Sequence, residues 1–431
     1  MKMKNIFWVS ILCFFLLIGC NTNTDGSQGD SSGNDDEDIV IRVAWWGGQD
    51  RHDKTMEVIE LFEAEYPHIT IEPEFTGWDS YWERLNTQAA GSNLPDVLQM
   101  DYSRLNDYNE NDLIIDLAPL IENGTINLDD VEDVYQDMNT VGDNVMAISL
   151  GANTISLLYD KDMLDKYGVS LEPGHTYDEL MERLSIVSEG EGSEYYGFDF
   201  ANNEYELFYL YARQNGEEFF NDEGTDLGFS KQTLHDYLDL MKEMLDNEIS
   251  PPHDFTMEFM NDGTTMLQNG YVAASMGSSN QLVAFSKTTD LNLGVTLLPA
   301  LQGGVHGNWI RPSQSFVISS HSQQEEAAAM FIDFVTNNLE ANEILKAERG
   351  VPISSKVREH LLPIVDNHVK ETFEFLEIAE DYSSDAFSSP PAGESEIAAS
   401  FFRAVEHFKY GRITVEEAVE QFFEEAEQLL Q

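Results

Sequence analysis

The chain has 431 residues, and its 79 acidic residues outnumber its 23 basic residues, so that the formal net charge is −56 at pH 7. A field of this sign repels phosphate backbones, and we therefore expect no nucleic-acid partner. Because single hydrophobic cores stop growing near roughly 250 to 300 residues, the length predicts at least two domains.

The acidic residues are spread along the whole chain, which is typical of a solvated surface rather than of a metal site. The best candidate loop for calcium, Asp222–Asp226, lacks the regular ligand spacing of an EF-hand. We therefore expect the protein to hold no metal and no cofactor.

The first twenty residues predict export and a lipid anchor. Two lysines precede an apolar run from Ile6 to Ile18, which is the layout of a secretory signal peptide over residues 1–19 and is too short to span a bilayer comfortably. Leu17–Cys20 resembles the bacterial lipobox, in which the cysteine is acylated and becomes the new N-terminus. We expect lipid on Cys20 to hold the protein at the extracellular face of the cell membrane. An ordinary signal peptide with an incidental cysteine is the alternative.

Residues 20–38 form the next segment, and they are rich in Asn, Ser, Gly and Asp without large apolar side chains. Such a segment cannot bury enough surface to fold, so we expect a disordered acidic tether that lets the folded body move. The only other cysteine, Cys13, lies inside the predicted signal peptide. The mature body therefore has no thiol pair to bridge, and its stability must come from core burial.

The folded body begins with an alternation of strands and helices. Ile39–Trp45 has the β-branched alternation of a strand, and the pair Gly47-Gly48 interrupts it. Apolar residues then recur at helical spacing until Pro67. Further along, the sequence predicts a strand over 69–75, a helix that Asp79 caps and that runs to Ala90, and a strand over 96–100. This order is typical of a parallel sheet with right-handed crossovers.

The rest of the chain keeps this mixed character and shows no internal repeat. The patterns predict helices over 161–167, 177–188, 204–215, 231–247, 325–338 and 415–430, and strands over 270–276, 293–298 and 316–319.

Two predicted strands end in residues that suit a ligand. In open parallel sheets, ligands bind beyond the carboxyl ends of the strands, where this chain places Trp45–Gly48 and Gln99–Tyr102. Glycine lets a ligand approach the backbone, tryptophan offers a flat apolar face, and Gln99 and Asp101 offer hydrogen bonds. This mixture suits a sugar, which has apolar CH faces and a rim of hydroxyls. Of Trp45 and Trp46, we expect one to pack inside and one to face the ligand.

Two further tryptophans are candidates for ligand contact. Trp82 is expected in the core, whereas Trp78 lies at the loop before the same helix and is open to either role. Trp309 also lies in a predicted loop, just before Arg311-Pro312-Ser313.

Several blocks in a consistent order resemble the extracellular solute-binding protein family 1, the carbohydrate receptors of ABC importers. The blocks cover nearly the whole mature chain, and only together are they specific. They are Ala44–His52, Gly77–Trp82, Leu94–Tyr102, Gly151–Thr154 leading into Leu158–Asp162, Gly294–Pro299 and Gly350–Pro352.

The resemblance implies an α/β fold of two lobes, the type II fold of periplasmic binding proteins. Each lobe would have a central mixed sheet flanked by helices. Lobe 1 would comprise residues 39–150 plus 299–350, and lobe 2 residues 151–298 plus 351–431. Ligand would lie in the cleft between the lobes and close them by hinge bending.

By position in the family pattern, the resemblance also implies the two walls of that cleft. Trp45, Trp46, Gly48, Asp101 and Trp309 would line the wall of lobe 1. Asn153, Glu204 and the loop Ser278–Asn280 would belong to the facing wall, with Ser278 and Asn280 as its contacts.

The expected ligand is an oligosaccharide, and an acidic one is a favoured subtype. The pair Arg51-His52 is similar to members that bind pectin-derived, rhamnogalacturonan-type oligosaccharides, and the guanidinium of Arg51 or Arg311 could pair with a uronate carboxylate. The simpler interpretation is that these arginines pair with surface carboxylates. The resemblance further implies a monomer that delivers its ligand to ABC transporter permease subunits.

A surface-anchored glycosidase or polysaccharide lyase acting on plant-cell-wall oligosaccharides is the alternative. Two carboxylates in a cleft suffice for glycoside hydrolysis, and in a chain this acidic some pair will always lie close. The sequence lacks H-E-x-x-H and G-x-x-x-x-G-K-[ST] motifs and keeps no free cysteine nucleophile after processing. We therefore expect a receptor rather than an enzyme.

Overall fold

The computed structural model describes residues 38–142, 144–192, 194–200, 203–221, 224–261, 264–384 and 394–430. The predicted signal peptide, the lipidation site Cys20, nearly all of the tether and the loop residues Asp222 and Glu223 lie outside these ranges. Within them, no helix combines the length and the apolar character needed to cross a membrane.

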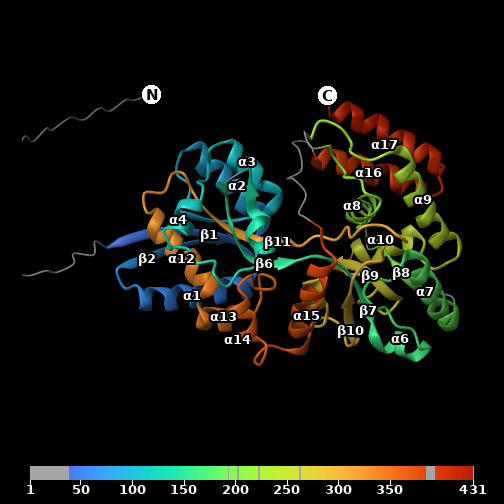
Figure 1. The fold of residues 1–431 in the computed structure, drawn as a ribbon, viewed down its shortest axis with the longest axis horizontal. Helices are drawn as coiled ribbons and strands as arrows, with labels where there is room; N and C mark the ends of the chain where they lie inside the picture. The colour runs from blue at the N-terminus through green and yellow to red at the C-terminus, as the bar shows by residue number, and fades with distance from the viewer. Residues whose placement is uncertain are drawn as a thin grey trace, which may run out of the picture. The chain divides into compact units, whose positions relative to one another are not determined.

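The first sheet has the strand order β2-β1-β3-β11-β6 (Figure 1). Its parallel part, β2 with β1 and β1 with β3, confirms the predicted alternation of strands and helices. β11 returns antiparallel to both β3 and β6. The bounds are Ile39–Trp46 for β1, Ile69–Thr76 for β2, Val97–Met100 for β3, Ile148–Asn153 for β6 and Arg311–Ile318 for β11.

The second sheet has the order β10-β7-β9-β8. β7 pairs antiparallel with both β10 and β9, whereas β8 is parallel to β9. The bounds are Ile155–Asp160 for β7, Tyr196–Asp199 for β8, Val272–Ser278 for β9 and Leu293–Thr296 for β10. A separate hairpin joins β4 (Thr140–Val141) and β5 (Asn144–Val145).

The helices begin and end close to where local signals predict. Thr176 forms a capping box with Glu179 at the start of α7, and Thr414 does the same with Glu417 at the start of α17. Asp79 is not the cap of α2, because Gly77 holds that position and Asp79 lies in the first turn. The helices are α1 Gln49–Glu65, α2 Trp78–Ala90, α3 Tyr102–Glu110, α4 Ala118–Glu122, α5 Asp133–Gln136, α6 Lys161–Tyr167, α7 Tyr177–Glu191, α8 Glu204–Gln214, α9 Lys231–Asp246, α10 His253–Asn261, α11 Gln281–Phe285, α12 Glu325–Asn337, α13 Leu339–Leu345, α14 Ser355–Leu361, α15 Asn367–Asp381, α16 Glu394–Lys409 and α17 Val415–Leu429.

The chain passes between the sheets at places that the strand order defines. The first crossing joins β6 to β7 at residues 153–155, and the second joins β10 back to β11 at residues 297–310. α15 is the third connection, because Phe373 packs in the core of the first sheet and Phe375 packs against residues of β10. Two cores joined by three connections make a two-lobe α/β fold.

The lobe boundaries drawn at 150, 298 and 350 remain a proposal. Val357 and Leu361 of α14 belong to the core of the first sheet, together with Phe331 and Phe62. This packing favours placing the last boundary within α15 instead of at residue 350.

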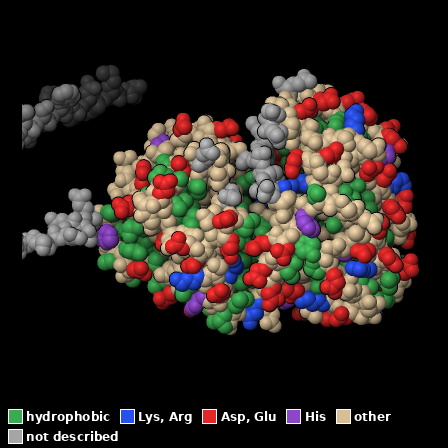
Figure 2. Space-filling model, viewed as in Figure 1, with side chains coloured by type: hydrophobic (Ala, Val, Ile, Leu, Met, Phe, Trp, Pro, Cys, Tyr) green, Lys and Arg blue, Asp and Glu red, His purple; other side chains and the backbone are tan. Residues whose placement is uncertain are grey.

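The acidic side chains are scattered over the surface as the charge pattern predicts. On the face drawn in Figure 2, Asp and Glu are spread over the surface and Lys and Arg lie among them in ones and twos.

Candidate ligand-binding site

A cavity of about 230 Å³ lies where elements of both lobes meet. Its walls come from the start of α3, from α8, from the end of the second crossing with the start of β11, and from the first residue of α16. The lining residues are Tyr102, Ser103, Met138, Tyr205, Glu206, Tyr209, Trp309, Ile310, Arg311, Pro312 and Glu394.

Aromatic rings form the apolar part of the cavity. Tyr205 and Tyr209 lie one turn apart on α8, with ring centroids 5.2 Å apart and nearly perpendicular planes. The ring of Trp309 lies 6.3 Å from that of Tyr209. Trp309 is buried, and the guanidinium of Arg213 lies 5.8 Å from its ring centroid. The packing therefore holds these rings in place before any ligand arrives.

Arg311 forms the basic part of the cavity and joins three segments. Its Nε donates to Asn153 Oδ1 at 3.1 Å, and its Nη1 lies 2.9 Å from Glu206 Oε1. The side chains of Arg311 and Glu206 keep 28% and 36% of their surface exposed. The ion pair therefore faces solvent enough for another carboxylate to reach the guanidinium.

A second carboxyl group, that of Glu394, lines the same cavity. Burial raises the pKa of Glu394, a hydrogen bond with Tyr205 opposes this shift, and the negative charge of Glu206 adds to it. Burial also raises the pKa of Tyr205 and of Tyr209, so both phenols stay protonated as hydrogen-bond donors. The cavity thus offers ring faces, hydroxyl donors, one guanidinium and two carboxyl groups.

The tryptophans of β1 lie on opposite faces of the first sheet, because successive residues of a strand alternate. Trp45 is fully buried, and its indole N–H donates to His52 Nδ1 at 3.1 Å. Trp46 is buried too, with Trp78 5.0 Å away and Trp82 5.6 Å away by ring centroids. We expected one of Trp45 and Trp46 to face the ligand; Trp46, at 7% exposed, is no more enclosed than the cavity residue Trp309, at 5%, and the most exposed ring of this group is that of Trp78, at 42%. Trp82 is in the core, as predicted.

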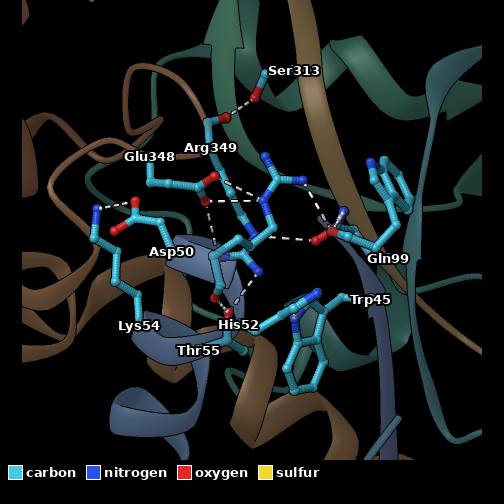
Figure 3. A network of polar contacts seen from close by, with 11 residues as sticks. Trp45, Asp50, His52, Lys54, Thr55, Gln99, Ser313, Glu348 and Arg349 are labelled. Atoms are coloured by element: carbon cyan, nitrogen blue, oxygen red, sulfur yellow. Dashed lines mark hydrogen bonds and ion pairs between the residues drawn. The ribbon is translucent and has the colours of Figure 1, made fainter. Parts of the chain in front are cut away.

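Arg51 and Gln99 take part in an internal network (Figure 3). Arg51 Nε lies 2.8 Å from Glu348 Oε1, and Arg51 Nη1 donates to the carbonyl of Trp46 at 3.1 Å. Gln99 is fully buried and also donates to that carbonyl, at 3.3 Å. Neither side chain is among the residues that line the cavity.

The remaining predicted residues differ in how close they come to the cavity. Asp101 caps α3, since its carboxylate accepts from the amide and the hydroxyl of Ser103, a lining residue. Glu204 is only 1% exposed and pairs with the buried Lys409. Gly48 is the N-cap residue of α1, Ser278 ends β9, and the exposed Asn280 precedes α11; none of these three lines the cavity.

The structure therefore brings Trp309, Arg311, Asn153 and Asp101 to one place. Sequence reasoning missed the lining residues Tyr205, Glu206, Tyr209 and Glu394. The i, i+4 spacing of two tyrosines on a predicted helix was a signal that could have found the first and third. No local pattern marks Glu394. Among the described residues, no cluster of three or more His, Cys, Asp or Glu is arranged to hold a metal ion.

Known proteins are similar to this chain over most of its length. The family model of bacterial extracellular solute-binding proteins matches residues 48–340. A binding protein of Brucella abortus (strain 2308) is 26% identical over 289 residues, which are 65% of this chain and 67% of that protein. A family 1 extracellular solute-binding protein of Alicyclobacillus acidocaldarius has a TM-score of 0.79 at 26% identity, covering 92% of this chain and 99% of that chain.

A solved relative also carries a sugar. The periplasmic oligogalacturonide-binding protein of Yersinia enterocolitica, in complex with saturated digalacturonic acid, has a TM-score of 0.76 at 25% identity, covering 91% of this chain and 98% of that chain. The matching family model and this relative are solute-binding proteins, which confirms the expectation of a solute-binding protein rather than a glycosidase or lyase. With a two-lobe fold and a family model that matches more than half of its residues, the chain belongs to the bacterial extracellular solute-binding proteins.

Proposed function

We propose that the protein is a lipid-anchored extracellular receptor that captures an oligosaccharide in the cavity around Trp309 and delivers it to an ABC import permease. The single observation that carries the proposal is the meeting of four aromatic rings and the guanidinium of Arg311 in one cavity built by both lobes. Rings pack on the apolar faces of a sugar, and polar groups at the edges bind its hydroxyls. The similarity to an oligogalacturonide-binding protein supports this ligand class.

The two sides of the cavity support a mechanism of capture. Trp309 packs with Tyr205 and Tyr209 in the core of the second sheet, not on the wall of lobe 1 as the resemblance implied, while Tyr102 and Ser103 at the start of α3 line the cavity from the side of the first sheet. A ligand that contacts both sets bridges the two lobes. Its binding energy therefore favours the closed arrangement, because a ligand shifts a conformational equilibrium by its differential affinity for the two states.

We propose that the ligand is acidic and that Arg311 reads its carboxylate. Arg51 is the weaker candidate, because its guanidinium is already paired with Glu348 and is only 13% exposed. Arg311 is paired with Glu206, and we propose that a uronate takes the place of that carboxylate in a charge-assisted hydrogen bond.

The other predicted residues keep proposed roles at the rim. Trp78, held edge-on against Trp46, is proposed to stack on a further sugar unit of a longer ligand. Asp101, Gly48, Ser278 and Asn280 are proposed to contact ligand only when it extends beyond the cavity.

Isothermal titration calorimetry of the full chain with saturated digalacturonic acid and with maltotriose tests the proposal. We expect the acidic sugar to bind at least tenfold more tightly, and to be recovered intact by chromatography. Equal affinity for both sugars would refute the acidic subtype. Absence of binding to any plant-cell-wall oligosaccharide would refute the carbohydrate receptor.

Lipidation is tested separately by mass spectrometry of the protein from bacterial membranes. We expect the mature N-terminal peptide to begin with acylated Cys20. We expect the Cys20→Ala variant to be released from the membrane fraction. Its retention there would contradict the lipid anchor.

A further inference from the structure

The guanidinium of Arg349 is enclosed beside the carboxyl end of β1 in the first lobe. The proposed function assigns it no role. Its side chain is 4% exposed. Nε donates to Gln99 Oε1 at 3.1 Å, Nη2 donates to Thr55 Oγ1 at 2.8 Å, and Nη1 lies 3.6 Å from Glu348 Oε2. Figure 3 shows Arg349 lying between these three side chains.

Gln99, Glu348 and Thr55 in turn contact the residues that follow β1, either directly or through Arg51. Gln99 donates to the carbonyl of Trp46, as does Arg51, which Glu348 in turn holds by two contacts of 2.8 and 3.1 Å. The hydroxyl of Thr55 donates to the carbonyl of Arg51 at 2.7 Å, which ties the first turn of α1 to the same point. Residues 46–51, the β1–α1 turn, are therefore held through Glu348 and Arg349.

The loop that carries Glu348 and Arg349, residues 346–350, is itself fixed against the strands β6 and β11. Lys346, Ala347 and Gly350 have φ values of +50°, +57° and +107°, so the backbone turns tightly. The carbonyl of Arg349 accepts from the hydroxyl of Ser313 on β11. It also passes so close to Gly151 on β6 that a Cβ there would lie 2.6 Å from the oxygen.

We propose that Glu348 and Arg349 are positioning residues, which couple β6 and β11, the strands next to the two crossings, to the β1–α1 turn at the carboxyl end of β1. A buried arginine is weak evidence for stability, because desolvation offsets much of its attraction, whereas its fixed fork of donors specifies geometry. A shift of β6 or β11 during lobe closure moves the 346–350 loop, and the loop moves the turn. Only the predicted change in sugar affinity rests on the proposed function; the coupling itself does not.

Hydrogen exchange of the full chain without ligand tests the coupling. The amide of Gly47 donates to the carbonyl of Thr76 at 3.1 Å, and that of His52 donates to the carbonyl of Gly48 at 3.1 Å, so both report the order of the turn. In Arg349→Met we expect both amides to exchange at least tenfold faster, while the amides of β9 in the second lobe keep their rates. The matched control is Arg358→Met, because Arg358 is equally buried and pairs with Glu132 but does not contact the turn.

Exchange at Gly47 and His52 within twofold of the unmodified chain would overturn the proposal, and so would an equal acceleration in Arg358→Met. If Arg349→Met does not fold, Glu348→Gln serves instead, because it keeps the side-chain shape and releases Arg51. In this variant we expect about threefold faster exchange at the same amides. Unchanged rates would refute the coupling. Arg349→Lys keeps the positive charge but lacks the forked N–H donors of the guanidinium. We therefore do not expect this variant to show the slow exchange of the unmodified chain.

A calorimetric measurement separates this proposal from the proposed function. Where the unmodified chain binds an oligogalacturonide long enough to extend beyond the cavity to the β1–α1 turn, Arg349→Met should weaken binding at least fivefold and Arg358→Met less than twofold. If the unmodified chain binds no sugar, the proposed function fails and the exchange result still decides the coupling.

Discussion

Glu204 and Glu206 lie two residues apart on α8, yet they belong to different environments. Residues at i and i+2 of a helix do not share a face. Glu204 is 1% exposed and pairs with Lys409 inside the second lobe, whereas Glu206 is 36% exposed and pairs with Arg311 at the cavity. The comparison teaches that a buried charge is committed to one fixed partner, while a half-exposed charge stays available for exchange with a ligand.

The largest expected effect lies on the buried side of this comparison. Lys409→Met leaves the carboxylate of Glu204 without its partner in the core, and we expect the free energy of unfolding to fall by about 3–5 kcal/mol, measured by urea denaturation. Lys231→Met is the control, since its pair with Glu420 is about half exposed and should contribute less than about 1 kcal/mol. Equal losses in the two variants would show that burial does not distinguish these pairs.

On the exposed side, Arg311→Met should act on binding more than on stability. Removing a hydrogen bond to a charged group costs about 2 kcal/mol, so we expect the Kd for saturated digalacturonic acid to rise about thirtyfold. The affinity for maltotriose should change less than threefold, and the urea midpoint should stay close to that of the unmodified chain. Loss of affinity for both sugars alike would assign Arg311 a purely structural role.

The pH dependence of binding sharpens the comparison further. Burial raises the pKa of Glu394, so this carboxyl takes up a proton at a higher pH than an exposed glutamate. As the pH falls through that raised pKa, the cavity loses a negative charge. We therefore expect up to about tenfold tighter binding of an acidic sugar. Calorimetry measures this at pH values above the pKa of the uronate itself. Glu394→Gln is neutral at every pH and should flatten the profile; an unchanged slope in this variant would rule out Glu394 as its source.

The smallest effect is expected at Glu206. Glu206→Gln keeps the shape of the side chain and frees the guanidinium of Arg311 from a half-exposed partner, which is worth about 0.5 kcal/mol. We expect the affinity for saturated digalacturonic acid to increase by about twofold to threefold. A decrease would mean that the carboxylate of Glu206 itself accepts a hydrogen bond from the sugar.

Most of the fold could be predicted because its signals are local. Pro67 and the alternation in β1 act within a few residues, and the elements they delimit agree with the structure to within a few positions. The antiparallel return of β11 between β3 and β6 was not predicted, because strand pairing joins residues more than 150 positions apart and leaves no local pattern.

The candidate site was predicted less completely, for a related reason. Trp309 was found through its place in a predicted loop and through the family pattern, and Arg311 through its charge, which could pair with a uronate. Glu204 was chosen where its neighbours Tyr205 and Glu206 line the cavity, because only the fold shows that Lys409, 205 residues away, pairs with Glu204. Arg51 and Gln99 have the right chemistry for a ligand, but Glu348 and Arg349 already satisfy their polar groups.

The placement of Trp309 gives the protein a built-in optical reporter. The guanidinium of Arg213 lies 5.8 Å from its ring centroid and the ring of Tyr209 lies 6.3 Å from it, in the segment that joins the two sheets. A ligand bound in the proposed cavity would change quenching and polarity around that ring, so we expect fluorescence of the unlabelled protein to follow binding. On the proposed function, the protein would then serve as a scaffold for a reagent-free sugar sensor.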